Sequence, residues 1–480
     1  MDLKKKAFKG VQWTSLSSIS NAVIQFLRIA ILARLLEASD FGLMAIVMMI
    51  MGFMSLFSDM GINSAILHKQ KISTKEYSSL YWFNFMINGF LMLFIILSSF
   101  GIAAFFNEPK LTILIPLMSI NLLFTALGRQ FAVVAQKNLH FRFISLVEIL
   151  TSIVSLIPAV ILAVNGFGVY SLIYSTLFAS LCSNLCFFIR FRKKHRIRLH
   201  YKFAETKSFL KIGLFQSGGQ ILNYFNTQFD VILIGKLLGT DVLGIYNLAK
   251  NLAMRPMQVI NPIVTRLSAP ILAKMQDDPD MLKDSFLKIV RYLSYANFPI
   301  HFFIAAFSLP IINVVYGMDD STMASILSIL SLFYMIRSIG NPIGGLVIAK
   351  GRTDIEFYWN VGVFAVFPLF IYIGSMHSVV GVAIAQLLFM VLSYIPGWFF
   401  MVKKLIHASL KNYIMPIVPS LLVSATVSVC SVLLLSLFPF SNIVVCIVGF
   451  LFFMIIFVLC IFLYDKDIYK IVSSMFRKKY

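Results

Sequence analysis

Residues 8–42 read FKGVQWTSLSSISNAVIQFLRIAILARLLEASDFG, and residues 210–244 read LKIGLFQSGGQILNYFNTQFDVILIGKLLGTDVLG. A shift of 202 positions aligns the two segments without a gap and places Gly42 on Gly244. Each segment is long and apolar enough to cross ~30 Å of hydrocarbon as a helix, at about 1.5 Å per residue. The pair therefore predicts a membrane protein built from two related halves.

Composition extends this prediction to the whole chain. Its 480 residues are 59% hydrophobic and 13% charged, whereas ordinary globular chains carry about 25% charge. The apolar residues form runs of about 20 or more, not the ~10-residue alternating segments of a membrane β-barrel. We expect an all-α polytopic membrane protein of about fourteen transmembrane helices, placed at residues 11–36, 41–67, 79–106, 111–136, 143–164, 168–190, 210–238, 243–273, 291–315, 322–349, 355–374, 379–402, 413–437 and 441–464.

Basic residues sort to one side of these helices. The opposite loops hold a single one, Lys110. By the positive-inside rule both termini of this multi-pass membrane protein are cytoplasmic. The net charge of +21 follows from this asymmetry and from attraction to anionic membrane lipids, so we expect no nucleic-acid partner. The basic segments include residues 4–6, 190–198, 350–352, 403–404 and 477–479.

The repeat predicts the domain organisation. Both copies start in the cytoplasm because an even number of predicted helices separates them, so the repeats are parallel, as in transporters with a site between their halves. We expect an N-terminal lobe at 1–191, a basic cytoplasmic linker at 192–210 and a C-terminal lobe at 211–402. Residues 403–480 would add two helices and a basic tail. The two pseudo-symmetric six-helix lobes would surround a central cavity.

Polar stripes run along three of the predicted helices. Polar side chains in hydrocarbon are costly, so such stripes are expected to face a protein interior or a water-filled cavity. At about 100° per residue, the members of each stripe fall on one helix face. The first helix carries Thr14, Ser17, Ser18, Asn21, Gln25 and Arg28, the seventh carries Gln216, Gln220, Asn223, Asn226, Thr227 and Asp230, and the eighth carries Asn247, Lys250, Asn251, Arg255, Gln258 and Asn261.

Charges within the membrane are the candidate functional groups. The repeat superposes Arg28 on Asp230, which predicts a pair that is either a structural ion pair or a gate released by an anionic headgroup. Lys250 and Arg255 have no acidic neighbour on their stripe and favour an anionic ligand. Asp59 is a candidate ion or proton site, or a partner for an arginine. The uncharged residues predicted to line the cavity are Asn21, Gln25, Asn223 and Asn251.

Enzyme signatures are missing from the sequence. It contains no GxxxxGK[ST], HExxH or GxSxG string and no CxxC pair. The five cysteines lie in apolar segments, which favours packing over metal ligation or disulfides. His301 is favoured as an interior histidine satisfied by hydrogen bonds over a proton relay. We therefore expect no enzyme, no catalytic residue, no metal and no cofactor, and favour a transporter.

The chain resembles a known transporter family. The carriers of the resemblance are KGVQWTSLSSISNAVIQFLRIAILARLLEASDFGLMAIV at 9–47, LFSDMGINSAIL at 56–67 and DVILIGKLLGTDVLGIYNLA at 230–249. They look like the polysaccharide transporter branch of the multidrug/oligosaccharidyl-lipid/polysaccharide (MOP) exporter superfamily, in particular Wzx-type flippases and exporters of the colanic or teichuronic acid type.

The resemblance carries its own expectations. It implies a location in the bacterial cytoplasmic (inner) membrane and a two-lobed fold that opens inward and outward. It implies an undecaprenyl-pyrophosphate-linked glycan as substrate, namely a repeat unit of O-antigen lipopolysaccharide, capsule or exopolysaccharide. It also implies alternating access driven by a gradient of H⁺ or Na⁺. Polysaccharide polymerase or assembly proteins are expected partners.

Three other functions stay open at the level of sequence. A drug or cation antiporter of the same superfamily would usually have twelve helices and a cavity dominated by acidic residues, whereas basic residues prevail here. A peptidoglycan-precursor flippase would differ only in the headgroup it carries. A non-transporting scaffold of a glycan-assembly complex is disfavoured because it would not need costly polar stripes.

Overall fold

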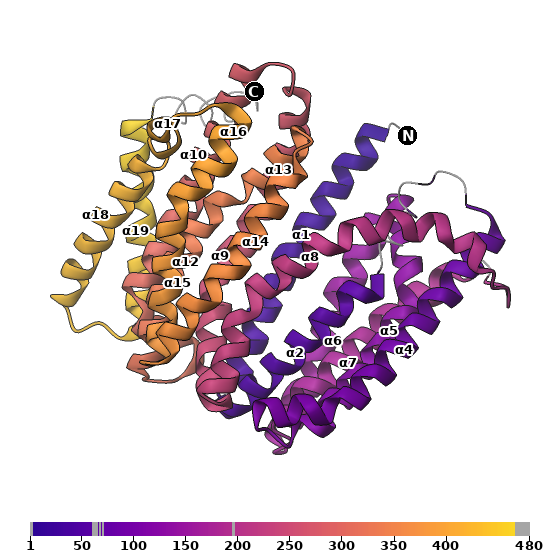
Figure 1. Cartoon of the computed structure of the whole chain (residues 1–480). Coiled ribbons are helices and arrows are strands. Elements are labelled where there is room, and N and C mark those ends of the chain that lie inside the picture. The colour runs from indigo at the N-terminus through magenta and orange to yellow at the C-terminus, as the bar shows by residue number, and fades with distance from the viewer. Residues whose placement is uncertain (1–2, 60–65, 67–68, 70–71, 194–196, 466–480) are drawn as a thin grey trace. The chain divides into compact units, whose positions relative to one another are not determined.

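The computed structural model describes residues 3–59, 66, 69, 72–193 and 197–465. Throughout this part the ordered elements are helices, with no strand (Figure 1). The all-α prediction is confirmed. By contacts the chain divides into two compact units, Met1–Asn247 and Leu248–Tyr480.

The N-terminal unit begins with α1 and ends within α9. Its helices are α1 (Leu3–Leu32), α2 (Ala38–Asp59), α4 (Thr74–Phe106), α5 (Leu111–Lys137), α6 (Phe141–Val164), α7 (Val169–Phe191), α8 (Phe203–Leu237) and the first part of α9 (Thr240–Lys274). The C-terminal unit contains the rest of α9, α10 (Pro279–Ala306), α11 (Ser308–Tyr316), α12 (Ser321–Gly340), α13 (Pro342–Ala349), α14 (Thr353–Ser375), α15 (Val379–Gly397), the π-helix η1 (Trp398–Val402), α16 (Lys403–Ile406), α17 (Leu410–Ile414), α18 (Val418–Ser436) and α19 (Asn442–Tyr464).

Most of these helices can cross a membrane. Within the described residues, eleven spans are long and apolar enough, or up to twelve if α10 and α11, bent by 82°, form one. Neither α8 nor α9 is among them, although each has 35 residues, about 52 Å of helix against a ~30 Å core. Both carry the predicted polar stripes. The prediction of about fourteen crossings therefore depends on counting α8 and α9.

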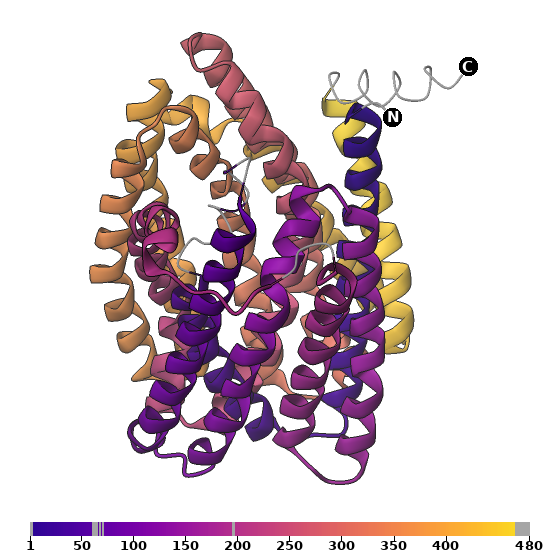
Figure 2. The same cartoon turned by 90° about the vertical axis from the view of Figure 1, so that its right-hand side faces the viewer.

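The helices of the N-terminal unit pack side by side (Figures 1 and 2). α4 packs on α5, α5 on α7, α7 on α6 and α6 on α1, while α8 packs on α2 and α4. One core of this unit is aromatic: Phe131 is fully buried, and its ring lies edge-on to Tyr77 and to Phe188. Because α8 packs on α2 and α4, the N-terminal compact unit includes α8 and extends to Asn247. The N-terminal lobe predicted from the sequence repeat ends earlier, at residue 191.

The C-terminal unit is centred on α10 and α12. α10 packs on α12 and α18, α12 on α15, and α15 on α14. Its core includes a stack in which the ring of Tyr413 lies 6.4 Å from that of Phe286 and 5.0 Å from that of Tyr394, with interplanar angles of 17° and 12°. This stack joins α10, α15 and α17.

Capping explains one difference from the predicted boundaries. The third helix was predicted from residue 79, but α4 begins at Thr74. Ser73 and Glu76 form a capping box: the Glu76 N–H donates to Ser73 Oγ at 3.2 Å, and the Ser73 N–H donates to Glu76 Oε2 at 2.8 Å. These bonds satisfy N–H groups that the first helical turn leaves open.

The two aligned glycines of the repeat meet where α2 and α9 begin. A Cβ built on Gly42 would overlap the carbonyl oxygen of Thr240, and one built on Gly244 would overlap that of Ala38. Ala38 and Thr240 are themselves related by the 202-residue shift, so the two copies cross symmetrically. Small residues four apart on both helices permit this close approach, a frequent form of helix packing in membranes.

We expect Gly42→Ala to destabilise the fold. The new methyl group meets backbone rather than a flexible side chain, so the two helices must separate, at a cost of about 1–3 kcal/mol. The measurement is the thermal unfolding of purified protein in detergent. Gly101→Ala on α4 is the control, because its Cβ meets nothing within 4 Å. Equal unfolding temperatures for the two variants would contradict the close packing.

Candidate functional site

The polar stripe of α1 bonds within the N-terminal unit. Ser17 is buried, with 1% of its surface exposed, and its Oγ donates to Glu148 Oε2 of α6 at 2.5 Å. Asn21 Nδ2 donates to Ser17 Oγ at 3.2 Å. Gln25 is half-buried further along the same face. This part of the predicted cavity lining therefore takes part in the packing of α1 on α6.

Arg28 is the last residue of the polar stripe on α1, and its side chain contacts α7. Its Nη2 donates to Ser175 Oγ at 2.7 Å and lies 3.4 Å from Thr176 Oγ1. Both recorded partners are neutral hydroxyls, so the positive charge of the guanidinium is not cancelled by them. A half-buried arginine in this state is a ready donor to a phosphate, because its planar fork has further N–H groups to offer.

Asp230 is held by a tyrosine. The carboxylate, 3% exposed on α8, accepts a hydrogen bond from Tyr246 Oη of α9 at 2.6 Å through Oδ2. Its Oδ1 accepts from the backbone N–H of Val231 at 2.8 Å. Tyr246 is fully buried. Asn223, two turns earlier on α8, is exposed.

The predicted pair of Arg28 and Asp230 is not among the contacts that the structure describes. The recorded hydrogen bonds of Arg28 go to α7, and those of Asp230 come from Tyr246 and Val231. The repeat gave the two residues equal depth along their helices, but equal depth does not bring two side chains together laterally. Their role as a gate stays a prediction.

In the C-terminal unit, α9 carries the two other predicted cations. Lys250 is buried, with 8% exposed, and Asn251 beside it is half-buried. Arg255 is half-buried, and its Nη1 lies 3.5 Å from Gln258 Oε1. The recorded hydrogen-bond partner of Arg255 is therefore neutral, as for Arg28. Tyr316, whose Oη donates to the Leu248 carbonyl at 3.1 Å, lies near this arginine.

Further along α9 the stripe serves packing. Asn261 is 1% exposed, donates from Nδ2 to the Ser338 carbonyl at 2.8 Å and accepts from Asn297 at 3.1 Å. One turn beyond Asn297, His301 is fully buried. Neither of its ring nitrogens has a hydrogen-bond partner among the described residues. The prediction of an interior histidine is confirmed, whereas the predicted hydrogen bonds to the ring are not found among the described residues.

Some predicted residues lie outside what the structure describes. The side chains of Asp59 at the end of α2 and of Gln216 on α8 are among these, so their roles stay predictions. Sequence reasoning also missed two residues, Glu148 and Tyr246. Glu148 could have been found, because it is an acidic residue within an apolar predicted helix. Tyr246 gave no signal, since tyrosine is common in membrane helices.

The fold of the chain resembles that of solved transporter structures. It resembles the structure of the lipid II flippase MurJ in an inward closed conformation, with a TM-score of 0.75, 16% identity, and 95% of this chain and 99% of that chain covered. An inward-facing multidrug resistance MATE family transporter of the MOP superfamily follows with a TM-score of 0.58 and 13% identity, covering 80% of this chain and 97% of that one. The chain therefore has the fold of MOP superfamily transporters.

Sequence comparison gives the family. The polysaccharide biosynthesis protein family model matches residues 31–350, so the chain belongs to that family. It is 29% identical over 425 residues to the lipopolysaccharide biosynthesis protein WzxC of Escherichia coli (strain K12), covering 86% of this chain and 85% of the relative. It is 28% identical over 429 residues to the teichuronic acid biosynthesis protein TuaB of Bacillus subtilis (strain 168), covering 89% and 88%. The predicted family is confirmed.

We expect Tyr246→Phe to destabilise the N-terminal unit. The substitution removes the hydroxyl that donates to Asp230 and leaves a buried carboxylate oxygen without that bond, at a cost of about 0.5–2 kcal/mol. The measurement is unfolding in detergent, with Tyr372→Phe on α14 as the control, because Tyr372 is 45% exposed. A variant as stable as the control would show that the bond contributes nothing.

Proposed function

We propose that this protein is a flippase that moves undecaprenyl-pyrophosphate-linked oligosaccharide across the cytoplasmic membrane. Family membership supports the process, since the relatives WzxC and TuaB are named for lipopolysaccharide and teichuronic acid biosynthesis. Another relative, ExoT of Rhizobium meliloti (strain 1021), is named a succinoglycan biosynthesis transport protein. The chain would thus transport a glycan intermediate rather than transform it.

The observation that carries the proposal is that two arginines, each on a helix expected to cross the membrane, have neutral hydrogen-bond partners. Arg28 meets Ser175 and Thr176, and Arg255 meets Gln258. A charge at bilayer depth costs about 3 kcal/mol or more, so it needs a functional reason. A pyrophosphate supplies one, because guanidinium groups bind phosphate oxygens with paired, charge-assisted hydrogen bonds.

The mechanism that we propose is alternating access driven by a gradient of H⁺ or Na⁺. The pyrophosphate and glycan would pass along the polar faces of α1, α8 and α9, where Asn21, Gln25, Asn223 and Asn251 offer hydrogen bonds to hydroxyl groups. The lipid tail would stay in the bilayer, because moving it through a hydrated path would expose apolar surface to water. Both termini would be cytoplasmic, and polysaccharide polymerase or assembly proteins would receive the product.

We expect Arg28→Ala and Arg255→Ala each to lower surface polysaccharide at least about tenfold in a deletion strain, compared with the wild-type gene at equal protein level. Loss of one charge-assisted phosphate contact is worth about 1.5–3 kcal/mol, and 1.4 kcal/mol is about tenfold. Lipid-linked repeat units would accumulate on the cytoplasmic face. Arg34→Ala is the matched control, because Arg34 is exposed beyond the end of α1.

Other outcomes would replace the proposal. Unchanged surface glycan combined with altered resistance to cationic compounds would identify a drug or cation antiporter, for which the buried carboxylate of Asp230 would be the natural site. Loss of viability on depletion, with accumulation of peptidoglycan precursors, would identify a peptidoglycan-precursor flippase. Full export by both arginine variants would show that neither residue binds the headgroup.

A further inference from the structure

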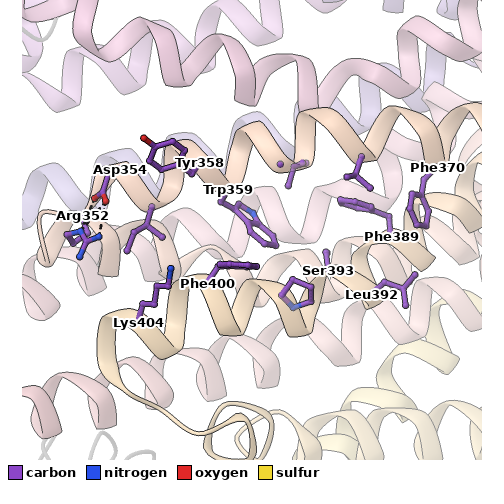
Figure 3. Close-up of a pocket in the computed structure, with 15 residues that line it drawn as sticks. Arg352, Asp354, Tyr358, Trp359, Phe370, Phe389, Leu392, Ser393, Phe400 and Lys404 are labelled. Atoms are coloured by element: carbon purple, nitrogen blue, oxygen red, sulfur yellow. Dashed lines mark hydrogen bonds and ion pairs between the residues drawn. The ribbon is translucent and has the colours of Figure 1, made fainter.

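The C-terminal unit contains a groove between α14 and the segment formed by α15 and η1. It encloses a cavity of about 610 Å³, within the range of about 300–1,000 Å³ that ligand pockets occupy. Its walls are mainly apolar and aromatic (Figure 3). The lining includes Trp359 and Phe370 from α14, and Phe389, Leu392 and Phe400 from α15 and η1.

One end of this groove is basic. Figure 3 shows Arg352 and Lys404 at the end opposite Phe370 and Phe389. Arg352 forms a two-point ion pair with Asp354, with both Nε–Oδ1 and Nη2–Oδ2 at 2.9 Å. The remaining N–H groups of its guanidinium stay open to a second acceptor. The Lys404 Nζ lies 5.4 Å from the centre of the Phe400 ring. Together Arg352, Lys404 and Asp354 give this end of the groove two cations and one carboxylate.

The groove has the dimensions of a lipid rather than of a small polar solute. Arg352 and Phe370 are 18 positions apart, or about 27 Å along a helix. That length exceeds the ~15 Å depth of one leaflet, half of the ~30 Å hydrocarbon core. Many of the apolar groups along it are open to the bilayer: Leu392 is 60% exposed and Phe400 48%. A charged end joined to a long apolar channel complements an amphiphile.

A break in helical geometry shapes the basic end. α15 ends at Gly397, after Pro396, and continues as the π-helix η1 before α16 begins at Lys403. The wider turn of a π-helix inserts an extra residue and so rotates all later side chains around the helix axis. Phe400 and Lys404 thereby reach the groove. Such insertions occur frequently at functional sites.

We propose that this groove binds one anionic glycerophospholipid, with its phosphate at Arg352 and Lys404 and an acyl chain along the aromatic wall. Charge complementarity selects this occupant: a hydrophobic helix of a partner protein would cover the apolar wall but leave one net positive charge, that of Lys404 beside the Arg352–Asp354 pair, without a counter-charge. Basic pockets between transmembrane helices are known to hold anionic lipid headgroups on the cytoplasmic side, where the positive-inside rule places residues 352 and 404. The site is independent of the transported glycan.

The first test changes the charge. Full-length protein would be reconstituted in nanodiscs of phosphatidylglycerol and phosphatidylcholine, and the lipid retained after detergent extraction would be counted by native mass spectrometry. Wild type should retain phosphatidylglycerol in preference to phosphatidylcholine. Lys404→Gln should lower that retention about fivefold. A basic residue near an anionic lipid surface contributes about 1 kcal/mol of binding free energy, which corresponds to a factor of about five in affinity. The variant leaves the pair of Arg352 and Asp354 intact.

A matched control removes a cation elsewhere. Arg192→Gln at the end of α7 has the same charge change and also takes away a cation that lies over a ring, with Cζ 5.7 Å from the centre of Phe188. It should retain phosphatidylglycerol as wild type does. The proposal is overturned if Lys404→Gln equals this control, or if wild type retains both lipids equally.

The second test fills the groove without touching its charges. Gly362 on α14 lines the cavity, and a Cβ built there meets nothing within 4 Å, so Gly362→Leu should fold normally and occupy the acyl-chain channel. Retention of phosphatidylglycerol should fall severalfold although Arg352 and Lys404 remain. Wild-type retention by Gly362→Leu would reduce the site to surface attraction and overturn the proposal, as would a protein partner found in the groove in place of lipid.

Discussion

The structure depends on one constraint of the membrane: a polar side chain in hydrocarbon must bond within the protein or reach water. The described contacts show how the chain meets it. Ser17 bonds to Glu148, Tyr246 bonds to Asp230, and Asn261 bonds to Asn297. In each case the bond joins two helices, so the same polar groups that would be costly alone fix which helices pack together.

Sequence reasoning was strongest where the period and length of the apolar runs decide the outcome. The all-α class and the segments that become helices followed from the composition and the repeat, because the ~30 Å core sets the length of a helix that spans it. The family followed from the resemblance of residues 9–47, 56–67 and 230–249 to a known transporter family. It was weaker where lateral contacts decide. The partners of Arg28 on α7, and of Asp230 on α9, depend on which helices lie side by side, and a helical wheel contains no such information.

The arginines show why some of the site could be predicted and some could not. Any cation within an apolar segment is exceptional on energetic grounds alone, so Arg28 and Arg255 were recognisable from the sequence. Whether a carboxylate neutralises them depends on the distance between the guanidinium group and the nearest carboxylate, which the sequence does not give. The structure shows hydroxyl and amide partners for these arginines, and the proposed anionic ligand rests on this difference.

The repeat is symmetric in packing and asymmetric in charge. Gly42 and Gly244 each approach the backbone of the other's helix, at Thr240 and Ala38, so the 202-residue shift maps one contact onto the other. The same shift places Arg28 on Asp230, where charge is reversed and the hydrogen-bond partners differ. Close packing of small residues constrains both copies equally because a backbone overlap is costly wherever it occurs. The proposed anionic headgroup would place no such equal demand on the two positions, which is compatible with a cation in one copy and a carboxylate in the other beside the same glycine crossing.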